Sequence, residues 1–241
     1  MQSLETELER ARDLAVDDLA DAIETIGFEC TRCGACCKAE ADDPHTATVF
    51  PDEIRRLRRA DGGDADDAGG DDPADDVADG PAERDWRDVA RPMPYGLSDG
   101  DGGPTGETFE WALETDACGD CAFYREDESG LGACTVHGDR PLICETYPFS
   151  VALGGTSRPM GEAVDSAGMV RAHECEGLGR DIDRADAESL AAALKERAVR
   201  ELEEAIGVRD AYEPRSSGDS EVVVHDSEGA KRPDGRPLDG G

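Results

Sequence analysis

Cys30-Thr31-Arg32-Cys33-Gly34-Ala35-Cys36-Cys37 places four cysteines within eight residues of this chain. Thiols this close in sequence suit a metal ion, because zinc and iron need several soft ligands that converge on one point. Five further cysteines follow at positions 118, 121, 134, 144 and 175. The chain is therefore expected to be organised around metal bound to thiolates.

Two local geometries would bring the first cysteines together. In a helix, Cys30, Cys33 and Cys37 fall within roughly 60° of one face, and Cys36 lies about another 60° round. An irregular turn opened by Gly34 would also gather them, because glycine accepts backbone angles that other residues resist. In either geometry Cys30, Cys33 and Cys37 can share one site, while Cys36 completes it, bridges to a second metal or stays free.

Disulfides and ferredoxin-type clusters are the local alternatives. A Cys36–Cys37 bond would strain the backbone, and a redox-active Cys30–Cys33 pair lacks the preceding strand of thioredoxin-like motifs. The ferredoxin run C-x2-C-x2-C-x3-C-P is matched at three positions, but Glu40 stands at the fourth. Metal binding is therefore preferred to redox-active dithiols and to inert buried thiols.

A second group of cysteines has the form C-x2-C-x12-C-x9-C over Cys118, Cys121, Cys134 and Cys144. Two cysteines on a tight turn plus two from later segments commonly close a tetrahedral zinc site. Nearby His137 and His173 could each replace a thiolate, although surface or packing roles are more typical of such histidines. Arg140 is either a functional cation beside anionic thiolates or a partner in a plain salt bridge.

Several blocks in order resemble the CxxCxxCC (YkgJ-type) cysteine-cluster family, described as a zinc- or iron-chelating domain. The first is Phe28-x-Cys30-x-x-Cys33-Gly34-x-Cys36-Cys37, and the resemblance covers about residues 28–179 apart from an acidic insert. The remaining blocks are the helix-like Thr48–Leu57, Cys121-Ala-Phe-Tyr124, Gly132-Ala-Cys134-Thr-Val-His137, Arg140-Pro141-Leu-Ile-Cys144 and Tyr147-Pro148-Phe149.

The resemblance implies a set of metal ligands: Cys30, Cys33, Cys36, Cys37, Cys121, Cys134, Cys144 and Cys175. Cys118 is an addition to the family pattern and stays a candidate ligand on its spacing alone. Related domains occur in flagellin lysine methylases, where an iron–sulfur cluster is implied. That activity is not carried over, because no S-adenosylmethionine-binding segment is visible in this sequence.

The charge balance excludes several partners. The 58 acidic and 25 basic residues leave a net charge of -33, which repels nucleic acid and anionic membranes. Lys38, Lys195 and Lys231 are the only lysines. Acidity along the whole chain and arginine-rich cations predict a protein of an extreme halophile, whose high internal salt screens the repulsion.

The expected cellular compartment follows from the N-terminal residues and from the hydropathy of the chain. The N-terminal Met-Gln-Ser-Leu-Glu-Thr-Glu has no basic region and no apolar run, so no signal peptide is expected. No stretch approaches the roughly 18 apolar residues of a membrane span. A reducing cytoplasm is expected, where clustered cysteines more often bind metal than form disulfides.

The predicted fold is α+β: a small cysteine-rich, metal-held domain with a β-hairpin, flanked by N- and C-terminal helices. An apolar stripe predicts one long helix over 1–27, with Ser3 as N-cap, Gly27 as its end and either scaffold packing or a dimer seam as its role. The cysteine-cluster domain occupies 28–179 and carries a disordered acidic insert at 61–83. A second helix occupies 180–208, its pattern running from Ala185 to Ile206 with Gly207 after it, and a polar tail at 209–241 is predicted to be disordered, although Val222–Val224 could pair locally.

Within the domain, Pro51 is expected to start a short helix that runs to about Ala60. Residues 109–114 alternate as a strand does. Segments 122–124 and 133–137 are expected to form a hairpin that brings Cys121 and Cys134 to neighbouring strand ends.

Three functions compete on this sequence. The first is a zinc- or iron-binding protein whose metal gives structure and whose role lies in an unidentified protein partner. The second is an iron–sulfur oxidoreductase or methyltransferase-associated enzyme, and the third is a thiol or metal redox sensor. The sequence contains no phosphate-binding loop, nucleophile elbow or dinucleotide fingerprint. Whether the chain is an enzyme is therefore left open.

Overall fold

The computed structural model describes residues 3–39, 44–60, 83–100, 102–153, 163–165, 168–214 and 221–238. They form two compact units. The first unit comprises residues 1–33, 142–214 and 226–229, and the second comprises 34–141, 215–225 and 230–241. The division runs through the predicted cysteine-cluster domain of residues 28–179. Within the described residues no helix is long and apolar enough to cross a membrane.

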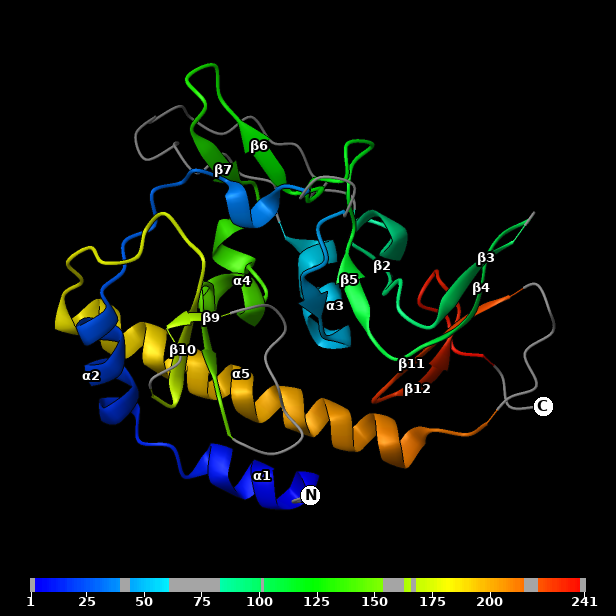
Figure 1. The fold of residues 1–241 in the computed structure, drawn as a ribbon. Helices are drawn as coiled ribbons and strands as arrows, with labels where there is room; N and C mark the ends of the chain where they lie inside the picture. The colour runs from blue at the N-terminus through cyan, green and yellow to red at the C-terminus, as the bar shows by residue number, and fades with distance from the viewer. Residues whose placement is uncertain are drawn as a thin grey trace, which may run out of the picture. The chain divides into compact units, whose positions relative to one another are not determined.

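The first unit is built on one long helix, α5 (Arg184–Ala211). Two shorter helices, α1 (Leu4–Arg12) and α2 (Val16–Ile26), pack along it, as Figure 1 shows in blue against yellow and orange. The short α4 (Leu142–Thr146) also contacts α5 and leads into an antiparallel sheet of order β8-β10-β9. The sheet consists of β8 (Phe149–Val151), β9 (Ala163–Asp165) and β10 (Val170–His173).

The core of the first unit lies between α5 and these elements. Ile23, Phe149 and Leu194 are almost completely excluded from solvent, and the ring of Phe28 meets Phe149 edge to face at 5.6 Å. Burial of such side chains stabilises a fold by about 1.5–3 kcal/mol each. Because Phe28 lies two residues before Cys30, this contact anchors the start of the first cysteine block to the core.

In its described residues, the second unit has several small sheets and one regular helix, α3 (Pro51–Arg59). One antiparallel sheet has the order β1-β5-β2, formed by β1 (Thr48–Val49), β5 (Trp111–Leu113) and β2 (Ala90–Pro92). The hairpin of β6 (Tyr124–Glu126) and β7 (Gly132–Cys134) is a second sheet. Short 3-10 turns occur at η1 (Ala35–Cys37), η2 (Trp86–Asp88) and η3 (His137–Asp139).

A third sheet of this unit has the order β12-β11-β4-β3. Its strands are β3 (Leu97–Gly100), β4 (Gly103–Thr108), β11 (Val222–Asp226) and β12 (Gly229–Lys231), and β11 runs parallel to β4. Trp111, Ile54 and Leu57 are buried in this unit, and Trp111 meets Trp86 edge to face at 5.1 Å.

Several sequence expectations are confirmed. Ser3 caps α1 by accepting from the Thr6 backbone N–H at 3.3 Å, and Gly27 ends α2 with φ of 75°. Pro51 opens α3, where Glu53 accepts from the Phe50 backbone N–H at 3.0 Å. The mixed α+β class, the strand within 109–114 and the hairpin that carries Cys134 are also confirmed.

The expectation of one long N-terminal helix is wrong. The chain leaves the helical conformation between Asp13 and Ala15, and buried Leu14 fills the corner. Lys195 of α5 donates to the Leu14 carbonyl at 2.8 Å, and Arg12 pairs with Glu203 of α5. The break thus lets both short helices contact α5, with a carbonyl at the corner satisfied by the partner helix.

The expected end of the C-terminal helix is also wrong. The helix continues through Gly207 to Ala211. A Cβ on Gly207 would lie 2.5 Å from the Cβ of Ser227, so this glycine serves a close approach between segments instead of a helix end.

The expectation of disorder over 209–241 fails for residues 221–238, which form β11, β12 and the turn after them. Val222, Val223 and Val224 are buried beside β4, a partner more than 100 residues earlier in the chain. Of the predicted insert 61–83, residues 61–82 lie outside the described residues, and Glu83 forms ion pairs with Arg58 and Arg59.

Candidate metal centre

The first cysteine block forms an irregular turn opened by a glycine, which is the second of the two geometries expected. Gly34 has φ of 75°, a left-handed conformation that glycine adopts without steric cost. The Cys37 backbone N–H donates to the Gly34 carbonyl at 2.8 Å and closes the 3-10 turn. Cys36 and Cys37 lie in this turn, and their sulfur atoms are 3.9 Å apart.

This turn is held against the β6–β7 hairpin and the loop before it. The Cys121 backbone N–H donates to the Cys37 carbonyl at 2.8 Å, and the Ala39 N–H donates to Asp120 at 2.8 Å. A Cβ on Gly34 would lie 2.1 Å from the Tyr124 hydroxyl oxygen, so the turn contacts that ring directly. The backbone contacts and the glycine together bring the Cys36–Cys37 turn next to Cys121.

A network of polar side chains fixes the Tyr124 ring. Its hydroxyl donates to Glu126 at 2.8 Å, and Lys38 forms an ion pair with the same carboxylate. The Lys38 ammonium also lies 5.4 Å from the centre of the ring. Tyr124 is paired with Cys134 across the hairpin. The ring therefore has little freedom to move away from Gly34.

Three thiols of the second unit are close enough to influence one another electrostatically. Burial is the main cause that raises the pKa of Cys121 to about 11, and the negative charges of Cys134 and Cys36 add to it. Burial, followed by the charge of Cys36, likewise raises the pKa of Cys134. Repulsion of this kind is what a bound cation relieves.

Cys36 differs from its neighbours because its thiolate is stabilised. The hydrogen bond with Cys37 is the largest cause that lowers the pKa of Cys36 to about 7, and the backbone and the charge of Arg140 contribute further. A thiol with this pKa is substantially ionised at neutral pH, and the thiolate is the form that binds metal and reacts with electrophiles. Cys36 is therefore the most reactive thiol of the group.

Arg140 lies beside the thiols as a fixed positive charge. It interacts with Cys36 and Cys134, and its Nε donates to the His137 carbonyl at 3.0 Å. Its own carbonyl accepts from Arg56 at 3.0 Å. In the described part of the chain its guanidinium pairs with no carboxylate. This environment favours the interpretation of Arg140 as a cation that offsets thiolate charge over that of a plain salt bridge.

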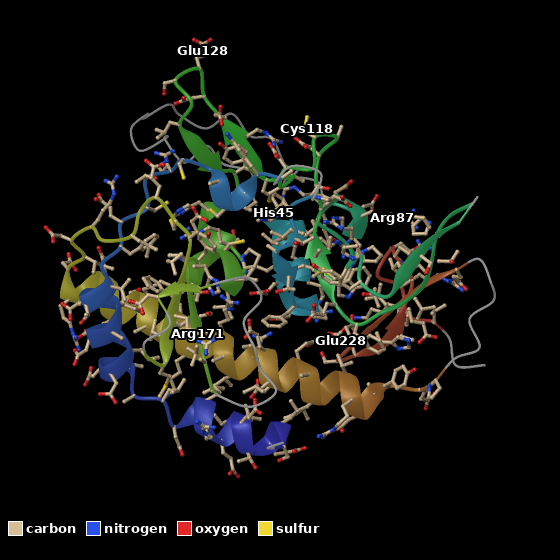
Figure 2. All side chains as sticks on the ribbon, viewed as in Figure 1. His45, Arg87, Cys118, Glu128, Arg171 and Glu228 are labelled. Atoms are coloured by element: carbon tan, nitrogen blue, oxygen red, sulfur yellow. The ribbon has the colours of Figure 1, made fainter. Side chains whose placement is uncertain are left out.

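Cys118 occupies a different position from Cys121. It is exposed at the tip of a loop, where Figure 2 shows its side chain at the outer end. Asp116 organises the loop by accepting from the backbone N–H groups of Cys118 at 2.8 Å and Asp120 at 3.1 Å. Among the residues described, no hydrogen bond joins Cys118 to another thiol, and its role as a ligand stays a prediction.

The other four cysteines belong to the first unit. Glu29 donates its backbone N–H to the Gly177 carbonyl at 3.1 Å, which places Cys30 beside the loop that carries Cys175. A Cβ on Gly177 would lie 2.3 Å from the Glu29 carbonyl oxygen, so the approach depends on this glycine. Within the loop, the Gly177 N–H donates to the Cys175 sulfur at 3.4 Å.

Cys33 and Cys144 complete the first-unit set. Arg32, between Cys30 and Cys33, has φ of 57°, an uncommon value for a residue with a side chain. Cys144 lies in α4, and the hydroxyl of nearby Tyr147 donates to the Glu174 carbonyl next to Cys175. This hydrogen bond ties the α4 segment to the Cys175 loop.

The donor chemistry fits zinc or iron, and the geometry is open. None of the nine cysteines forms a disulfide, and soft thiolates are ligands that zinc and iron–sulfur centres accept. Within the described residues no three His, Cys, Asp or Glu side chains are yet gathered as a metal requires. Binding would thus have to draw the side chains inward, and the assignment of each cysteine as a ligand stays a prediction.

The histidines separate into distinct roles. His173 shares a 2.8 Å hydrogen bond with Ser150, and His137 is exposed. His45, which no sequence pattern marks, is largely buried, and burial lowers its pKa although the backbone of Cys36 acts in the opposite direction. Sequence reasoning could not find His45, because it lies in a polar segment more than 70 residues before Cys121.

The structure defines a cysteine-rich protein, in which each of the two units carries thiols that could serve as soft metal ligands. The model of the CxxCxxCC family, described as a putative zinc- or iron-chelating domain, matches residues 29–176. The match covers more than half of the chain, and the protein belongs to this family. Comparisons with curated proteins and with solved structures find no match.

Proposed function

We propose that this protein chelates zinc or iron through cysteine thiolates in a reducing, cytoplasmic environment. The observation that carries the proposal is the group Cys36, Cys121 and Cys134. These three thiols come from distant parts of the sequence; the charges of Cys36 and Cys134 raise the pKa of Cys121, and the charge of Cys36 raises the pKa of Cys134. Ionising all three thiols, as metal binding requires, is unfavourable unless a cation offsets the charges, and the family description names the cations.

The second unit supplies the better-supported site. Cys36, Cys121 and Cys134 are its three interacting thiols, and Cys37 lies close enough to Cys36 to compete for a fourth position. Arg140 reduces the electrostatic cost of bringing the thiolates together. The first-unit cysteines, Cys30, Cys33, Cys144 and Cys175, form a second candidate group whose loops are tied together by the Glu29–Gly177 contact.

The order of ligand recruitment follows from the pKa values. Cys36 is the first thiol to ionise, and Cys121, whose pKa is raised to about 11, ionises readily only when a metal displaces its proton. The bound metal would supply a crosslink between segments that are far apart in sequence. Because the ligands are not gathered beforehand, we expect metal binding and closure of the site to be one coupled process.

The test is the metal and acid-labile sulfide content of the protein purified without oxygen. One or two zinc ions per chain and no visible colour would support a structural chelating domain. Equal iron and sulfide with a brown absorption band would support an iron–sulfur protein. A chain that retains neither metal, and that binds neither on reconstitution, would refute the proposal.

Two matched serine variants assign the site. Cys36→Ser should weaken metal affinity by on the order of 100-fold, because it removes the first ligand and its charge. Cys118→Ser removes an exposed thiol on the same unit and should leave the affinity unchanged. Equal affinities of the two variants would show that the interacting group is not the site.

A second function, redox sensing, is favoured by the Cys36–Cys37 pair. When the metal leaves, peroxide can oxidise the Cys36 thiolate, whose pKa is about 7, to a sulfenic acid with release of water or hydroxide, and a thiol reductant reverses this. The test is whether mild peroxide releases the metal and a thiol reductant restores binding. Metal that stays bound at peroxide levels that oxidise free cysteine would exclude this function.

A further inference from the structure

His45 is fixed in place beside the thiol group by its own main chain. Its backbone N–H donates to the Gly119 carbonyl at 2.8 Å, and its carbonyl accepts from Arg91 at 2.8 Å. Gly119 belongs to the loop that ends at Cys121, so His45 and Cys121 are held by the same segment. The position of His45 is therefore set by contacts that need no ligand.

One nitrogen atom of the His45 ring is buried. Nδ1 is shielded from solvent and has no hydrogen-bond partner among the described residues. The ring lies against the backbone of Cys36. An unsatisfied buried polar atom costs about 1–3 kcal/mol, and such an atom calls for an explanation. The other candidates differ, because His173 is bound to Ser150 and His137 is exposed.

The chemistry of metal-bound histidine matches this arrangement. A histidine ligand uses one ring nitrogen for the metal and commonly directs the other to a backbone carbonyl or carboxylate, which fixes the orientation of the ring. In His45 the contact with the Cys36 backbone would play the orienting role and leave Nδ1 free for a metal. Sites with three cysteines and one histidine are a standard tetrahedral set for zinc.

We propose that His45, through Nδ1, is the fourth ligand of the second-unit metal site, together with Cys36, Cys121 and Cys134. Cys37 then stays outside the ligand set as the hydrogen-bond partner of the Cys36 sulfur. A neutral imidazole in place of a fourth thiolate leaves one negative charge fewer in the site, which suits a group already in mutual repulsion. This inference rests on the proposed chelating function and specifies its ligands.

The direct test is nuclear magnetic resonance of the full-length chain with nitrogen-15-labelled histidine, loaded with cadmium-113 in place of zinc. We expect one histidine Nδ1 to show coupling to cadmium. The coupling should vanish in His45→Gln, whose amide can still reach the Cys36 backbone, and persist in the matched control His137→Gln. Bound cadmium with no histidine coupling, or a coupling that survives His45→Gln, would overturn the proposal.

Zinc affinity provides an independent measurement. His45→Gln should weaken zinc binding at least tenfold and by more than Cys37→Ser does, whereas the matched control His137→Gln should change it less than threefold. If Cys37→Ser binds zinc weakly and His45→Gln binds it as the unmodified chain does, the fourth ligand is Cys37 and the proposal for His45 is rejected. If the unmodified chain binds no metal, the chelating function itself fails, so the two failures are distinguishable.

Discussion

Replacing Gly34 by alanine should damage the second-unit site more than an equivalent change elsewhere. Gly34 has φ of 75°, and a Cβ there would lie 2.1 Å from the Tyr124 hydroxyl oxygen and 2.5 Å from the ring carbon that bears it. The ring could yield only by giving up its hydrogen bond to Glu126 and its contact with Lys38. The variant is therefore expected to separate the Cys36–Cys37 turn from the hairpin.

The free-energy cost of Gly34→Ala has two parts, one from the backbone and one from the contact with Tyr124. A left-handed conformation costs a residue with a Cβ about 1–2 kcal/mol. Loss of the hydrogen bond from Tyr124 to a charged acceptor adds about 1–3 kcal/mol. Because closure of the site and metal binding are coupled, this second part should appear in the metal affinity as a loss of roughly 5- to 150-fold.

Comparison with Gly130→Ala separates the cost of the Tyr124 contact from the cost of the backbone conformation. Gly130 has φ of 84°, and a Cβ there would meet no atom within 4 Å. This control lies in the loop of the same hairpin and bears the backbone cost alone. Zinc affinity by competition with a chromophoric chelator and urea unfolding should be measured for both variants. Equal losses in the two would refute the argument that contact with Tyr124 positions the cysteine turn.

Three further predictions follow from other parts of the chain. Cys36 should dominate the alkylation of the metal-free, reduced protein. The alkylation rate should rise as the pH increases through about 7, because the thiolate forms above its pKa. A rate that rises only above about pH 8, or that persists in Cys36→Ser, would contradict this. Asp183→Ala removes the N-cap of α5, which accepts from the Asp186 N–H at 2.9 Å, and should lower the free energy of unfolding by about 1 kcal/mol, whereas exposed Asp181→Ala should not. Raising potassium chloride from about 0.1 M to 1 M shortens the screening length from about 10 Å to about 3 Å and should raise the Tm of a chain with net charge -33; a Tm that is independent of salt would reject the halophilic hypothesis.

The sequence alone determined the features that depend on local chemistry. Ser3 as a cap, Pro51 at a helix start and Gly27 at a helix end are set by side chains and φ angles within a few residues. The hairpin with Cys134 follows from local alternation and from the turn at residues 126–130. The cysteine blocks identify the metal-chelating family because thiol spacing is written directly in the chain.

Only the tertiary structure decided the features that depend on distant partners. The break at Asp13 exists because Leu14 and its carbonyl meet α5, and Gly207 stays helical because Ser227 approaches it. Residues 222–224 form a strand because β4 offers an edge more than 100 residues away. For the same reason, the charge interactions of Cys36 with Cys121 and Cys134, the exposed position of Cys118 and the buried Nδ1 of His45 could not be found from spacing. Spacing describes neighbours along the chain, whereas a metal site is defined by distances in space.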